Sequence, residues 1–106
     1  MRKQCLSLSK RTTLTYEREV NGAGQPTLRL VGNSGPGLFN TTAIAIDDIH
    51  ALIGDQGVIN TVSLRPLYPQ RSLNSAGFLL AVLCHEGYVS KHPHQAYAYV
   101  WRPTCS

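Results

Sequence analysis

The chain has 106 residues, a hydrophobic fraction of 42% and a charged fraction of 15%, values that fit one folded domain, residues 1–106, and exclude a disordered chain. Ten lysines and arginines against six acidic residues give a net charge of +4. Such a surplus favours an anionic partner, either nucleic acid or an acidic protein surface, although it also serves simply to keep a small protein soluble.

The N-terminal segment is basic and lacks the features of a secretory leader. Four cations precede the first acidic residue: Arg2, Lys3, Lys10 and Arg11. Leu6 and Leu8 are separated by a serine, so the segment has no continuous apolar core. The longest apolar run, residues 78–84, is too short to cross a bilayer. We therefore expect a cytoplasmic protein whose basic N-terminal side chains contact an anionic partner.

A β-hairpin is predicted after this basic segment. Residues 12–20 alternate in polarity, with Leu14 and Tyr16 on one face and threonines and glutamates on the other. Residues 21–26 have the asparagine, glycine and proline content of a turn, and residues 27–31 resume the extended pattern. The two extended segments are therefore expected to pair.

Residues 47–54 predict one short amphipathic helix. Asp47 and Asp48 stand where the N-terminus of a helix favours negative charge, and Gly54 can adopt the left-handed conformation that ends a helix. One helical face carries the apolar residues Ile46, Ile49, Leu52 and Ile53. The residues just before, 43–46, fit either a short strand or the start of this helix.

Three further strands are predicted in the second half of the chain. Residues 58–67 alternate in polarity, and residues 96–102 form the last extended segment. Residues 78–84 are apolar on both faces, which predicts a central strand. The order of elements favours an α+β fold, a mainly antiparallel sheet of about five strands with one short helix packed on one face.

Neither a metal nor another cofactor is predicted. The glycine-rich segment 32–37 lacks the Gly-Lys-Ser or Gly-Lys-Thr sequence of a phosphate-binding loop. His92 and His94 can share a zinc ion with a third ligand, but none of the candidates has the spacing of a zinc site: Cys84, His85, Glu86 and Cys105. The three cysteines are Cys5, Cys84 and Cys105. They include no CxxC pair, so we expect reduced thiols.

The histidines also allow an enzymatic alternative, a small metal-independent ribonuclease-like toxin. RNA cleavage without a metal needs a base, an acid and a cation near the phosphate. His85, His92 or His94 can supply the base and the acid, and Lys91 or Arg102 can supply the cation. No motif fixes the geometry of these side chains, so the chain is interpreted as an enzyme only in this alternative.

The last predicted strand carries a stripe of aromatic residues. Tyr97, Tyr99 and Trp101 alternate with small residues, so they share one face of the strand. If that face is exposed, it offers a platform on which bases stack or a ridge for protein docking. If it faces the helix, the same rings form part of the core.

The hypothesis that these observations favour is a stand-alone, non-enzymatic binding or inhibitor module. Compact phage or mobile-element regulators have the same profile of size and composition. Its partner is nucleic acid or a protein complex that handles nucleic acid. No segment carries a motif set that identifies a family. The residues expected to contact the partner are Arg2, Lys3, Lys10, Arg11, Lys91, His92, His94, Tyr97, Tyr99 and Trp101.

Overall fold

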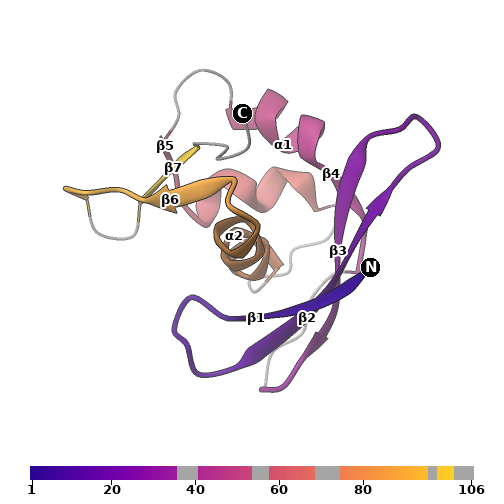
Figure 1. Ribbon diagram of the computed structural model, residues 1–106. Coiled ribbons are helices and arrows are strands. Elements are labelled where there is room, and N and C mark those ends of the chain that lie inside the picture. The colour runs from indigo at the N-terminus through magenta and orange to yellow at the C-terminus, as the bar shows by residue number, and fades with distance from the viewer. Residues whose placement is uncertain (36–40, 54–57, 69–74, 96–97, 102–106) are drawn as a thin grey trace.

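A computed structural model describes residues 1–35, 41–53, 58–68, 75–95 and 98–101, and these form two antiparallel sheets packed with helices (Figure 1). The first sheet has the strand order β1-β2-β3-β4, with bounds β1 Arg2–Leu6, β2 Thr13–Val20, β3 Pro26–Asn33 and β4 Ile44–Ala45. The second has the order β5-β7-β6, with bounds β5 Val58–Ile59, β6 Val89–Lys91 and β7 Tyr99–Trp101. The α+β class predicted from the sequence is confirmed.

The described residues include three helical segments: α1 Ile46–Ile53 connects the first sheet to the second, and the 3-10 helix η2 Val62–Leu67 and α2 Ser75–Glu86 lie between β5 and β6 in the chain. Figure 1 shows α2 nearly end-on, between β6 and the β1–β2 hairpin. The helix contacts β1, β2, β3, β6 and η2, so it is surrounded by other elements and forms the centre of the core. No helix within the described ranges is long and apolar enough to cross a membrane.

The predicted hairpin and the predicted short helix are both present. β2 and β3 pair antiparallel, with Tyr16 opposite Leu30 and both side chains buried. Helix α1 buries Ile46, Ile49 and Ile53, whereas Leu52 is exposed despite its predicted place on the apolar face. Residues 43–46 were expected to form either a short strand or the start of the helix. Both occur, because Ile44 and Ala45 form β4 and Ile46 begins α1. Gly54 lies outside the described residues.

The prediction of a central strand at residues 78–84 was wrong, because this segment lies inside helix α2. The segment is apolar on all sides because strands and a second helical segment cover most of its surface. A short apolar run does not distinguish a buried strand from a buried helix. Gly87 ends the helix with a φ of 87°. Its N–H donates to the carbonyl of Cys84, and the N–H of Tyr88 donates to that of Leu83, which is a Schellman cap.

Two other segments differ from the sequence predictions. In the segment predicted as a strand over residues 58–67, only Val58 and Ile59 are extended, and Val62–Leu67 is a 3-10 helix. Asn60 favours this turn, because its Oδ1 accepts the N–H of Ser63. Strand β1 was not predicted, since its inward-facing positions include Lys3 and give no apolar alternation. The prediction for residues 96–102 holds over β7, and residues 96, 97 and 102 lie outside the described ranges.

Candidate functional site

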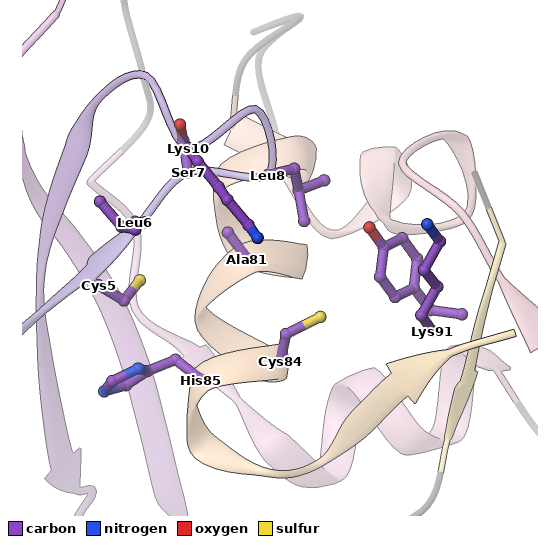
Figure 2. A pocket seen from close by; sticks show the side chains of 10 residues that line it. Cys5, Leu6, Ser7, Leu8, Lys10, Ala81, Cys84, His85 and Lys91 are labelled. Atoms are coloured by element: carbon purple, nitrogen blue, oxygen red, sulfur yellow. The ribbon is translucent and has the colours of Figure 1, made fainter. Parts of the chain in front are cut away.

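A cavity of about 670 Å³ opens between the first sheet, helix α2 and the second sheet. Strand β1 and the loop after it supply one wall, which consists of Cys5, Leu6, Ser7, Leu8 and Lys10. The floor is formed by α2 through Ala81, Cys84 and His85, and the opposite wall by Lys91 of β6 and Tyr99 of β7. We call this cavity the groove (Figure 2).

Lys10 reaches the groove from a tightly held loop. The N–H of Ser7 donates to the carbonyl of Thr12, and the N–H of Lys10 donates to the carbonyl of Ser7, both at 2.9 Å. Lys10 has a φ of 63°, a left-handed conformation that is uncommon for a residue other than glycine. Figure 2 shows its side chain directed from this loop toward α2. The fold thus fixes the position of one ammonium group at the groove.

Lys91 reaches the groove from the other side because of the register of the second sheet. β6 and β7 pair antiparallel with Lys91 directly opposite Tyr99. Residues opposite each other in an antiparallel pair have their side chains on the same face, so both line the groove. Burial, followed by the proximity of Cys84, raises the pKa of the Tyr99 hydroxyl, which therefore stays protonated at neutral pH.

The two thiols of the groove are poor nucleophiles. Burial raises the pKa of Cys5 to about 11, and the nearby charge of Glu86 adds to the effect. Burial also raises the pKa of Cys84 to about 11, with a further contribution from Cys5. Because the thiolate is the reactive form, both thiols are almost entirely unreactive at neutral pH. The groove therefore offers no activated cysteine next to His85.

A buried carboxylate, Glu86, binds the first sheet to the end of α2. Its side chain is 5% exposed and accepts a hydrogen bond from the Tyr16 hydroxyl. Lys3 Nζ lies 3.1 Å from Oε2 and Arg18 Nε lies 3.3 Å from Oε1. Burial opposes ionisation of this carboxyl, but the hydrogen bonds from Tyr16 and Lys3 and the charges of Lys3 and Arg18 outweigh it, so the pKa falls below its usual value.

Arg2 is held in a second ion-pair cluster on the outer face of the first sheet. Its guanidinium lies 2.8 Å from Glu17 Oε1, and that of Arg29 lies 2.7 Å from Glu17 Oε2. The hydrogen bonds from these two arginines lower the pKa of Glu17 to about 2. Arg2 and Lys3 were both predicted as partner contacts, and both form ion pairs with carboxylates of the protein itself.

The described part of the aromatic stripe packs inward. Trp101 stacks on His50 with ring centroids 5.4 Å apart and on Tyr88 with centroids 5.6 Å apart. Tyr99 and Trp101 are half-buried and pack against the core. This arrangement matches the interpretation of the stripe as part of the core, although Tyr99 also borders the groove. Tyr97 lies outside the described residues.

His92 and His94 lie in the loop after β6, and neither lines the groove. His92 Nδ1 accepts the backbone N–H groups of His94 and Gln95 at 3.0 and 3.1 Å. The proton of the neutral His92 ring is therefore on Nε2. The imidazole centroids of His92 and His94 are 6.2 Å apart. Within the described ranges, no cluster of three or more His, Cys, Asp or Glu side chains has the geometry to hold a metal ion.

Of the ten residues predicted as partner contacts, the structure brings three into one cavity: Lys10, Lys91 and Tyr99. Arg11 is exposed in the loop beside Lys10. Sequence reasoning did not assign Leu6, Leu8 and Ala81 to the site, and only recognition of β1 and of helix α2 would have placed them there. No protein-family model, no curated protein and no solved structure matches the chain.

Proposed function

We propose that the protein is a non-enzymatic binding module that holds an anionic macromolecular partner in the groove. The observation that carries the proposal is the charge of the lining. Lys10 and Lys91 face the groove from opposite walls, and no carboxylate is among the described residues that line it. In the described part of the chain neither lysine takes part in an ion pair, so both are available to a partner.

Exposed apolar side chains beside these cations support binding of a partner with an apolar part. Leu6 is 55% exposed and Leu8 is 38% exposed, and both line the groove. Apolar surface left in contact with water near polar groups is typical of interaction sites, because its removal from water favours association. The partner is therefore expected to combine negative charge with apolar groups.

The reactive side chains of the groove support binding over the ribonuclease-like alternative. General acid–base cleavage needs two titratable groups at the same phosphate. His85 lines the groove, whereas His92 and His94 do not. The two thiols nearby stay protonated, as their pKa values of about 11 require. The described lining of the groove thus offers a binding surface with one histidine and no second imidazole beside it.

The proposal places the protein in the cytoplasm. Cys5 and Cys84 are free thiols although both line the same groove. A reducing compartment keeps thiols in this state, whereas an oxidising one favours their conversion to disulfides.

Fluorescence anisotropy with labelled polyanions tests the proposal. The probes are oligothymidylate of about ten nucleotides and polyglutamate of about ten residues, titrated at salt concentrations from about 50 to about 200 mM. We expect at least one probe to bind, more weakly as salt rises, and to lose about tenfold or more in affinity in Lys10→Gln/Lys91→Gln.

The matched control is Arg29→Gln/Arg65→Gln, two exposed arginines outside the groove. Each double variant removes two positive charges from the same net charge of +4. The control should bind within about twofold of the wild type, since its lost charges do not line the groove. Absence of binding to both probes, or equal losses in the two variants, would overturn the proposal.

A further inference from the structure

We propose that the natural occupant of the groove is an extended, acidic segment of a partner protein, which binds as an added strand on the free edge of β1. The inference rests on the proposed function and names the class of partner. Both walls of the groove end in an edge strand, because β1 is the terminal strand of the first sheet and β6 is the terminal strand of the second. An edge strand presents backbone groups that another chain can pair with.

The backbone of β1 shows which groups are offered. The N–H of Arg18 donates to the carbonyl of Met1, and the N–H of Ser7 donates to the carbonyl of Thr12, so the odd-numbered positions of β1 bond to β2. In an antiparallel ladder the alternate residues point their N–H and C=O groups to the other side. Those of Gln4 and Leu6 are therefore directed to the edge that no described strand covers.

The side chains of β1 alternate between the two faces of the sheet. Gln4 and Leu6 are exposed, whereas Cys5 between them is buried. β6 is the shorter edge strand. The N–H of His92 donates to the carbonyl of Ala98, the residue before β7, so the backbone groups of Lys91 point away from β7. β1 is the longer edge, with five residues against three, and offers the better template for an added strand.

The side chains around the edge select an acidic segment with some apolar positions. Lys10 lies on the loop that continues from β1, and Lys91 lies across the groove, so carboxylates of an added strand can reach an ammonium group on either side. Side chains of an extended peptide alternate between two directions. The residues facing α2 would then meet Leu8 and Ala81 and favour apolar side chains.

The same observations favour a peptide over single-stranded nucleic acid. A groove that follows a phosphate backbone needs several cations and open aromatic faces for the bases. Arg2 and Lys3 are bound to Glu17 and Glu86, which leaves Lys10 and Lys91 as the cations of the groove itself. The ring of Trp101 already stacks on His50 and Tyr88. An extended peptide uses the apolar wall and the strand edge, which nucleic acid does not.

Selection from a random peptide library against the whole protein tests the inference, with oligothymidylate as the competing probe. We expect the selected peptides to be enriched in aspartate and glutamate, interspersed with apolar residues. Their affinity should fall by about tenfold or more in Lys10→Gln/Lys91→Gln, and stay within about twofold in Arg29→Gln/Arg65→Gln. Peptides without acidic enrichment, or no selected peptide at all, would overturn the inference.

Backbone methylation of the best peptide then tests strand addition itself. N-methyl groups are placed at alternate positions in two versions of the peptide, one set in each phase. Only one phase puts the methyl groups on the N–H groups that face β1, so we expect one version to lose binding and the other to retain it. Equal affinities of the two versions would contradict pairing with β1.

Failure of this inference is distinguishable from failure of the proposed function. If oligothymidylate binds and depends on Lys10 and Lys91 while no acidic peptide is selected, the groove binds an anionic partner but the partner is nucleic acid. The inference is then wrong and the proposed function stands. If neither oligothymidylate nor any acidic peptide binds, the inference and the proposed function are both wrong.

Discussion

The cations of the first sheet differ from those of the groove in what they contact. Lys3 and Arg18 meet the buried Glu86, and Arg2 and Arg29 meet Glu17, so two carboxylates offset half of the charge of these four cations. Lys10 and Lys91 lie in the groove and take part in no ion pair with the described residues. A net charge of +4 therefore does not describe one basic surface. One set of cations forms ion pairs within the fold, and the other is the set that we propose binds a partner.

Removal of Glu86 should give the largest change in stability. Glu86→Ala removes the acceptor of the Tyr16 hydroxyl and the carboxylate that meets Lys3 and Arg18. Because Lys3 and Arg18 are 33% and 44% exposed, water recovers part of the loss, and we expect a fall of about 1–3 kcal/mol in the free energy of unfolding. Urea denaturation of the variant and the wild type measures it.

Glu17→Ala is the matched control for Glu86→Ala, since it also removes a carboxylate that meets two cations. Arg2 and Arg29 lie at the surface and are hydrated once Glu17 is gone, so the loss should be much smaller than for Glu86→Ala. Equal losses in the two variants would contradict the distinction between the more buried carboxylate of Glu86 and the less buried one of Glu17, which are 5% and 13% exposed.

Acid should weaken the fold through the same two carboxylates. The pKa of Glu86 and that of Glu17 are lowered in the folded protein, Glu17 to about 2 from an ordinary value of 4.5. A lowered folded-state pKa gives stability that is complete above the unfolded value and is lost as pH falls toward the folded value. We expect the free energy of unfolding to decrease from pH 4.5 toward pH 2, with a shallower decrease in Glu86→Gln.

Neutralising the groove lysines should have the smallest effect on stability. Lys10→Gln/Lys91→Gln removes no described ion pair, so the free energy of unfolding should change by less than about 0.5 kcal/mol. Urea denaturation under the same conditions as for Glu86→Ala provides the comparison. A loss as large as that of Glu86→Ala would show that these lysines support the fold, and the division of the cations into two sets would be wrong.

The parts of the fold that were predictable from the sequence carry a local signal. The hairpin of β2 and β3 has clear alternation around Leu14 and Tyr16, and α1 has acidic residues at its start. Helix α2 was mistaken for a strand because its apolar run has no polar face to reveal the period. Gly87, directly after Glu86, was the one local sign of a helix end that could have corrected the assignment.

The candidate site was predictable only in part, because its geometry depends on contacts between distant residues. Lys10, Lys91 and Tyr99 were expected to contact a partner, and they do line one groove. Lys3 had the same expected role, yet it pairs with Glu86, 83 residues away in the chain. Charge and residue type are visible in the sequence, whereas the partner of each charge is set by the tertiary fold.

Amide hydrogen exchange of β1 tests most directly whether this edge is an open binding surface. In the free protein, the amides of Gln4 and Leu6 should exchange at least about tenfold faster than that of Cys5, which bonds to β2. Saturation with the tightest acidic peptide should slow Gln4 and Leu6 to the rate of Cys5. Equal protection of all three amides in the free protein, or no change on saturation, would contradict the assignment of β1 and the groove as the binding site.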